Sequence, residues 1–434
     1  MDFIPIYILV LAFTIVIDYF AGILIEKSAG NKRKWFLRMS LVANIGILGF
    51  FKYFNFFNDN ISWFLHLFSF TNPVTDVSFI LPIGLSFHTF QAMSYTIEVY
   101  RGNQKAERNF GIYALYVMFF PQLVAGPIER PQNVIHQFYE RKEFNYDRVV
   151  SGLKIMLWGF FKKLVIADRL SIYVNAVYNN PYHHSGKTFI VATFFFWFQI
   201  YCDFSGYSDI AIGSAKVMGY DLMENFKRPM FGGSISGIWN RWHLSLYTWF
   251  KDYVYQPLAR TAKRNRTKLL AYIVVIFLLS GLWHGANWTY IIWGAVSGLS
   301  IVVERIYKDK VKPQKYISKF WMKNLGSIIA FLFTGISCLF FRANSVSDAL
   351  HIGKSIITMK HGSLFKGSPP INFYYFVLAI LILFTVEYCQ ENLPQVKLVN
   401  NKSVVIRYAG YILALMIILM IGVFNGSQFI YFQF

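Results

Sequence analysis

Long apolar runs recur along the whole chain, and they restrict the fold more than any other feature. A helix crosses a bilayer with about 20 mostly apolar residues. The runs of this kind are 3–25, 37–57, 80–100, 153–174, 189–217, 269–282, 288–303, 324–341, 373–388 and 404–424. A short or re-entrant segment at 113–125 is interrupted by Pro121, Gly126 and Pro127. The sequence therefore predicts an all-α, polytopic integral membrane protein of about ten or eleven spans that forms a single domain over residues 1–434.

Charge supports this class and indicates a topology. Only 15% of the residues are charged, which is too few for an ordinary soluble enzyme, and the net charge is +20. Lysine and arginine gather in cytoplasmic loops of membrane proteins, so the excess does not require nucleic-acid binding. The loop 27–38 is basic whereas 58–78 has no lysine or arginine, which places the N-terminus outside. The basic stretches 260–268 and 305–319 are then cytoplasmic.

Several familiar site signatures are absent from the sequence. Cys202, Cys338 and Cys389 lie in apolar surroundings without CxxC spacing, so we expect neither a disulfide framework nor a metal site. Residues 233–237 are not a G-x-S-x-G motif because the third position is Ile235, and no H-E-x-x-H or P-loop motif occurs. The first run lacks a basic leader and a cleavage site, so we expect a retained helix rather than a signal peptide.

The segment 235–258 is too polar to span the bilayer. It interleaves tryptophan and tyrosine with residues such as Arg241, His243 and Lys251. Such a composition is typical of a helix at the membrane interface or inside a protein cavity.

Two histidines, His88 and His284, lie within apolar runs. An ionisable group at membrane depth is costly, by roughly 2.5 kcal/mol or more when charged, so a functional role is the first hypothesis. The glycines beside His284 allow close approach of a substrate, and a neutral imidazole can take a proton from an alcohol during acyl transfer. The alternative for His284 is a buried turn in which the ring bonds to a carbonyl, and for His88 a helix-packing hydrogen bond.

Asp203 and Asp209 also lie within an apolar run. Two carboxylates six residues apart are not on one helix face, so a catalytic dyad is not expected. They could orient a histidine or bind a cation, but we favour ion pairs with the arginines of the 227–241 region.

Ordered sequence blocks over about residues 80–345 resemble the membrane-bound O-acyltransferase family. The similarity is to its branch with the alginate O-acetyltransferase membrane subunit and the related peptidoglycan and teichoic-acid acylation proteins. The blocks are LPIGLSFHTFQ at 81–91, FPQLVAGPI at 120–128, DFSGYSD at 203–209, WNRWHLSL at 239–246, WHG at 283–285 and FRA at 341–343.

The resemblance implies a fold and a site. The fold is a ring of membrane helices with additional interfacial helices around a central cavity. His284 of the WHG block would be the catalytic histidine, and His243 the second histidine of the site. Five further residues would shape the cavity or bind substrate, namely Trp283, Asn287, Trp239, Arg241 and Asp209.

The resemblance also implies a reaction. Acetyl-CoA would be the acyl donor, with no tightly bound cofactor, and the acceptor would be an exported or cell-envelope polysaccharide. A periplasmic or surface SGNH-type acetyltransferase would be the partner, and the location a bacterial cytoplasmic (inner) membrane. The DFSGYS block is similar to the polysaccharide O-acetyltransferase branch rather than the D-alanyl branch, which usually has alanine at position 205.

Other functions stay open from the residues alone. Alginate, peptidoglycan and cellulose are all compatible acceptors, and D-alanyl transfer to teichoic acid is the alternative reaction. Asp203, Asp209 and His88 would also suit a transporter, although no internal repeat is visible. A non-enzymatic scaffold of a secretion complex is the third class. The basic residues at 263–268 could attract the phosphates of coenzyme A or serve only as a topology signal.

Overall fold

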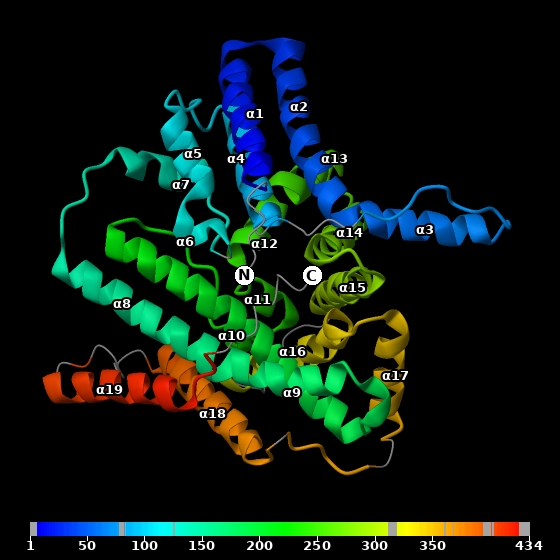
Figure 1. Ribbon diagram of the computed structural model, residues 1–434, viewed down its shortest axis with the longest axis vertical. Helices are drawn as coiled ribbons and strands as arrows, with labels where there is room; N and C mark the ends of the chain where they lie inside the picture. Colours follow the sequence, from blue (N-terminus) through cyan, green and yellow to red (C-terminus); the bar gives the residue numbers. More distant parts are fainter. Residues whose placement is uncertain are drawn as a thin grey trace. The chain divides into compact units, whose positions relative to one another are not determined.

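The chain folds into helices joined by loops (Figure 1). The computed structural model describes residues 7–424 except 78–81, 83, 125, 311–318, 360–361, 368, 394–400 and 402, and for 319–323 it describes the backbone alone. The described residues contain no β-strand, so the all-α prediction is confirmed.

Eight of the described helical segments are long and apolar enough to cross a membrane. They are Tyr7–Lys27, Gly30–His66, Gly186–Met218, Arg266–His284, Trp288–Lys310, Asn324–Arg342, Ile371–Asn392 and Val404–Ile421. The chain is therefore a multi-pass membrane protein, while the count of ten or eleven spans stays a prediction.

The contacts between described residues group into two compact units. Unit 1 comprises residues 1–150 and 214–223, and unit 2 comprises residues 151–213 and 224–434. The single domain over residues 1–434 stays a prediction. The described elements of unit 1 are α1 (Tyr7–Lys27), α2 (Gly30–Leu48), η1 (Gly49–Tyr53), α3 (Phe54–His66), α4 (Leu85–Arg101), α5 (Phe110–Met118), α6 (Phe120–Leu123), α7 (Pro131–Val134) and η2 (Ile135–Tyr139).

A buried polar network joins three helices of unit 1. Asp18 of α1 accepts hydrogen bonds from Ser40 Oγ at 2.6 Å and from Asn44 Nδ2 at 2.8 Å, both on α2. Ser40 Oγ also bonds to Thr96 Oγ1 of α4 at 3.0 Å. Because a polar group in an apolar interior is costly when it has no partner, these bonds fix how the three helices pack.

The long run after residue 30 does not form one straight helix. A π-helical turn, η1, separates α2 from α3, and α3 runs across the direction of α2 in Figure 1. On one face of α3, Asn58 Nδ2 donates to Asp76 Oδ1 at 2.8 Å in the returning segment. On the other face Phe57, Ile61 and Phe64 are each more than half exposed. This amphipathic pattern is typical of a helix that lies in the plane of the membrane interface.

Unit 2 contains most of the remaining helices. Its described elements are η3 (Phe161–Ala167), α9 (Asp168–Tyr178), η4 (Pro181–His183), η5 (Pro229–Phe231), α11 (Ile235–Trp239), α12 (Leu244–Phe250), η6 (Lys251–Tyr255), α13 (Gln256–Thr261), α14 (Arg266–His284), α15 (Trp288–Lys310), α16 (Lys319–Arg342), α17 (Val346–Ile357), α18 (Ile371–Asn392) and α19 (Val404–Ile421). Two of the boundaries between the units fall inside α8 (Tyr146–Phe160) and α10 (Gly186–Met218), and the third lies between residues 223 and 224 in the loop after α10.

The antiparallel helices α14 and α15 pack closely because glycines face the opposite backbone. A Cβ at Gly281 would lie 2.3 Å from the carbonyl oxygen of Tyr290, and one at Gly294 would lie 2.3 Å from that of Phe277. Small residues let membrane helices approach in this way. The pair turns over at residues 285–287, so the WHG block sits where the two helices meet.

Two consecutive lysines of the π-helix η3 hold α10 through buried ion pairs. Lys162 Nζ lies 2.7 Å from Asp209 Oδ2, and Lys163 Nζ lies 2.6 Å from Asp203 Oδ1 and 2.7 Å from Asp168 Oδ1. The expectation that arginines of the 227–241 region would pair with Asp203 and Asp209 is therefore wrong. Those arginines instead pair with a glutamate of α18, because Arg228 Nε and Arg241 Nη1 lie 3.1 and 3.0 Å from Glu391.

Candidate active site

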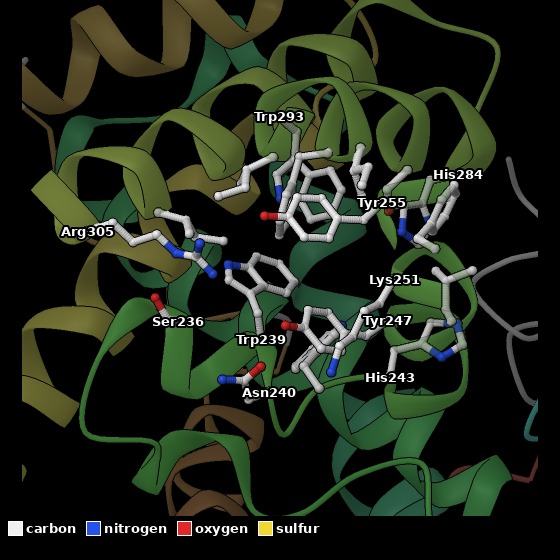
Figure 2. A pocket seen from close by; sticks show the side chains of 18 residues that line it. Ser236, Trp239, Asn240, His243, Tyr247, Lys251, Tyr255, His284, Trp293 and Arg305 are labelled. Atoms are coloured by element: carbon white, nitrogen blue, oxygen red, sulfur yellow. The ribbon is translucent and has the colours of Figure 1, made fainter. Parts of the chain in front are cut away.

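Unit 2 contains a cavity of about 270 Å³ between α11, α12, η6, α14 and α15 (Figure 2). Its lining combines aromatic and aliphatic side chains with two histidines and two cations. The lining residues are Ser236, Trp239, Asn240, Trp242, His243, Leu246, Tyr247, Phe250, Lys251, Tyr255, Ile273, Ile276, Phe277, Ser280, His284, Trp293, Ile301 and Arg305.

The cavity has an exposed end and a buried end. Lys251 and Arg305 are exposed, whereas His243 and His284 are only 2% and 4% exposed. Figure 2 shows Arg305 on the opposite side of the cavity from the two histidines. The α15 residues that line the cavity run from Trp293 to Arg305, a helical rise of about 18 Å. The space therefore suits an elongated ligand with its charged end at Arg305.

The ring of His284 is enclosed by aromatic side chains. His284 is the last residue of α14, and its ring centroid lies 5.0 Å from that of Trp283, 5.3 Å from Trp293 and 5.2 Å from Phe341. Trp293 comes from α15 and Phe341 from the FRA block at the end of α16. The WHG block, the FRA block and Trp293 of α15 therefore meet around one imidazole.

His243 lies close to His284 in the same cavity. Its ring packs edge-on against Phe204 of α10 with centroids 4.4 Å apart, and the Trp283 ring lies 6.1 Å away. Burial, with a smaller effect from the charge of His284, holds the pKa of His243 well below its ordinary value. His243 is therefore a neutral imidazole at pH 7.

A glutamate of α15 fixes the position of α11 at the exposed end of the cavity. Glu304 accepts hydrogen bonds from the Ser236 backbone N–H at 2.9 Å and from Ser236 Oγ at 3.1 Å, which ties the start of α11 to α15. Burial raises the pKa of Tyr247, so its hydroxyl is a neutral donor. Lys251 and Arg305 add positive charge beside it. This end can hold an anion, and the tyrosine can donate to it.

The structure brings together four of the predicted site residues. His243, His284 and Trp239 line the cavity, and Trp283 lies against both histidine rings. The Nε1 atoms of Trp239 and Trp293 are buried, and within the described part of the chain they have no hydrogen-bond partner. Buried donors of this kind are uncommon in folded proteins.

The other predicted site residues lie elsewhere and do not line the cavity. Asn287 caps the start of α15, because its Oδ1 accepts from the Thr289 N–H at 2.9 Å. Arg241 and Asp209 are held in the ion pairs described above. Their polar side chains are thus engaged in joining helices. His88 lies in α4 of unit 1, where it is buried.

Lys251 and Arg305 are site residues that the sequence did not single out. Arg305 belongs to a basic stretch that a topology signal explains, and Lys251 is one cation within the segment 235–258. The composition of that segment did predict a cavity or interface role, and the structure places α11, α12 and η6 around the cavity. Among the described residues, no group of three His, Cys, Asp or Glu side chains is arranged to hold a metal.

Comparison with known proteins identifies relatives of the region that carries this cavity. The model of the family described as "MBOAT, membrane-bound O-acyltransferase family" matches residues 37–342. The chain is 36% identical over 339 residues to the probable alginate O-acetylase AlgI of Azotobacter vinelandii, covering 77% of this chain and 65% of that protein.

Two other relatives carry different names. The peptidoglycan O-acetyltransferase of Helicobacter pylori is 34% identical over 391 residues, covering 82% of this chain and 71% of that protein. The teichoic acid D-alanyltransferase of Bacillus subtilis is 29% identical over 263 residues, covering 58% of this chain and 66% of that protein. The chain spans about 65% of the length of the alginate O-acetylase relatives.

Proposed function

This chain belongs to the membrane-bound O-acyltransferase family, and we propose that it transfers acetyl groups from cytosolic acetyl-CoA toward a polysaccharide outside the cytoplasm. The observation that carries the proposal is one cavity lined by two buried histidines, with Arg305 on the opposite side and a second exposed cation, Lys251, in its lining. The relatives whose names refer to O-acetylation are 34–38% identical, against 29% for the D-alanyl relative, which favours acetyl as the acyl group.

The two cations would bind the phosphates of the donor. Both side chains are exposed and line the cavity, and Arg305 lies in the basic stretch that charge distribution assigns to the cytoplasm. A guanidinium and an ammonium bind phosphate oxygens strongly. With the phosphates there, the thioester arm of coenzyme A would extend along α15 toward His284.

His284 would act as the general base, and His243 would complete the proton path beside it. The acceptor hydroxyl oxygen attacks the thioester carbonyl carbon, so a C–O bond forms and the C–S bond breaks. His284 takes the hydroxyl proton as general base and returns it to the departing sulfur, which leaves as the coenzyme A thiol. The aromatic side chains around His284 exclude water, which protects the thioester from hydrolysis.

The acceptor is an exported or cell-envelope glycan, or a partner that carries the acetyl group to it. The names of the relatives support alginate and peptidoglycan as glycan classes. We further propose a bacterial inner-membrane location and an SGNH-type acetyltransferase as the partner outside the cytoplasm.

Release of free coenzyme A from acetyl-CoA tests the proposal. The protein is purified into lipid nanodiscs, and wild type is compared with His284→Ala and His243→Ala. Wild type should release coenzyme A in the presence of an alginate or peptidoglycan oligosaccharide. His284→Ala should reduce release by a factor of about 100 or more, as loss of a general base does.

The matched control is His136→Ala, which changes an exposed histidine of unit 1. It should leave release unchanged. Unaltered release in His284→Ala would remove the assignment of the base. Sugar or ion flux in liposomes without acyl donor, together with no coenzyme A release, would favour a transporter instead.

A further inference from the structure

The side chain of Asn225 forms hydrogen bonds with His243 and with Ser245. Asn225 Oδ1 accepts hydrogen bonds from His243 Nδ1 at 3.1 Å, from the Ser245 N–H at 3.2 Å and from Ser245 Oγ at 3.0 Å. Asn225 Nδ2 donates to Ser208 Oγ of α10 at 3.0 Å. Asn225 is fully buried. All four groups belong to unit 2.

Asn225 also holds the backbone of His243 in an unusual conformation. His243 has φ +45° and ψ 55°, the left-handed region that a residue with a side chain seldom adopts. It precedes α12, and its own side chain does not cap that helix. Asn225 supplies the cap from a distance, because its backbone oxygen accepts from the Leu244 N–H at 2.9 Å and its Oδ1 accepts from the Ser245 N–H.

These bonds determine which nitrogen of His243 carries the proton. The Ser245 backbone N–H can only donate, so the Asn225 atom that faces it must be the oxygen. That oxygen can only accept, so His243 Nδ1 must carry a hydrogen. Ser245 Oγ, 3.5 Å from Nδ1, already gives its hydrogen to Asn225. In a neutral ring, Nε2 is then the atom with the lone pair.

An asparagine rather than an aspartate at this position has a chemical consequence. A carboxylate bonded to Nδ1 would stabilise the imidazolium, which has no lone pair to accept a proton. The neutral amide fixes the ring without adding charge, and His284 is the titratable group whose charge acts on His243. The hydrogen bond from His243 to Asn225 therefore favours a neutral His243 imidazole over an imidazolium.

We propose that Asn225 is a positioning residue that fixes His243 in one backbone conformation and one tautomer, with Nε2 as the proton-accepting atom in the active-site cavity. The inference rests on the proposed acyl transfer for its kinetic consequence. The tautomer itself can be measured without any reaction.

The first test is nitrogen-15 NMR of the histidine-labelled full chain in lipid bilayers at pH 7. The signals that disappear in His243→Gln belong to His243. They should show a protonated Nδ1 and an unprotonated Nε2. A protonated Nε2, or a doubly protonated ring, would overturn the proposal, whether or not the protein transfers acetyl groups.

The second test is the pH profile of coenzyme A release in Asn225→Asp. The new carboxylate should raise the pKa of His243, so the activity that is lost on acidification should be lost at a pH about one unit higher or more. Asn225→Leu should lower kcat by about 10- to 100-fold, as loss of an outer partner of a functional histidine does, with KM for acetyl-CoA little changed.

Asn44→Leu is the matched control, because Asn44 is equally buried but lies in α2 of unit 1. It should lower the folded yield without moving the pH profile. A profile of Asn225→Asp identical to wild type would contradict the positioning role. If Asn225→Leu does not fold, the Asn225→Asp profile and the NMR measurement still decide. Absence of coenzyme A release from folded wild type would count against the proposed function and leave the NMR test intact.

Discussion

Among single residues, His243 shows how burial sets a protonation state. The ring is 2% exposed and packs against Phe204 and Trp283, so no water solvates a positive charge on it. The pKa of the folded state therefore lies well below that of an unfolded chain, first because of burial and then because of the nearby His284. The burial that keeps His243 neutral, with a lone pair on one ring nitrogen, also makes the stability of the fold depend on pH.

The stability of the protein should fall as the pH falls below about 6.5, the pKa of an unfolded histidine. Below that pH the unfolded chain binds a proton at residue 243 that the folded chain does not, so acid favours unfolding. Thermal unfolding of the detergent-solubilised protein from pH 7.5 to 5 measures this, and His243→Gln should show a shallower pH dependence. The exposed His136→Gln should keep the wild-type slope, and an equal slope in all three proteins would contradict the assignment.

The two histidines of the cavity were predictable, but their supports were not. His284 could be predicted because an ionisable side chain in an apolar run has a high free-energy cost at membrane depth. His243 could be predicted because its sequence block resembles that of a known family. Asn225 lies 18 residues from His243 in a polar loop, and nothing local marks it. Lys251 and Arg305 carried charges that the topology already explained. Three other predicted residues lie in or beside the family-like sequence blocks but outside the cavity lining. Asn287 caps α15, and Arg241 and Asp209 form ion pairs with other helices.

Among the helices, η3 and α10 are joined by lysine–aspartate ion pairs in an apolar part of the protein. Lys162 and Lys163 are 3% and 7% exposed, and each faces at least one carboxylate. Consecutive residues on a regular helix point about 100° apart, and the π-helical turn of η3 changes their direction. Both lysines lie in this turn and pair with acids of α10, the helix that also presents Phe204 and Ser208 to the His243 site.

Lys163→Met should destabilise the protein by about 3–5 kcal/mol, because it leaves Asp168 and Asp203 buried without their cation. Unfolding in increasing SDS measures the free energy. The control is Lys142→Met, whose partner Glu140 is exposed, and it should cost less than about 1 kcal/mol. Equal effects of the two substitutions would show that the buried pairs are not structural supports.

Hydropathy located many of the helices but not their local geometry. The runs 3–25, 269–282 and 288–303 correspond to α1, α14 and α15. The run 37–57 continues through η1 into the first turn of α3, an amphipathic helix whose polar face is bonded to the returning loop. Composition does not encode a π-helical turn, and the lysine partners of Asp203 and Asp209 are a matter of tertiary packing.

For the molecule as a whole, charge distribution assigns the sides of the membrane. The loop around α3 has no lysine or arginine, whereas the segment before α14 is strongly basic. Since basic loops stay in the cytoplasm, the exposed end of the cavity near Arg305 is predicted to open to the compartment that contains acetyl-CoA.

Single cysteines at Thr71 and Thr267 test this orientation in a chain whose Cys389 is replaced by serine. Both threonines are exposed, and the remaining cysteines are buried. A membrane-impermeant maleimide added to intact spheroplasts should label Thr71→Cys and spare Thr267→Cys. Both should react after lysis. The opposite pattern would invert the topology and place the cations away from the cytosolic donor.

Every residue that lines the cavity comes from one uninterrupted stretch of chain, 236–305. The cavity walls are thus a cassette in the genetic sense, which recombination between relatives could exchange in a single event. A graft that begins at Ser236 would bring both histidines but leave Asn225 behind, whereas one that begins at Glu224 carries the cavity walls together with the residue that fixes His243. The segment that would have to be exchanged as a whole is therefore slightly longer than the walls of the cavity.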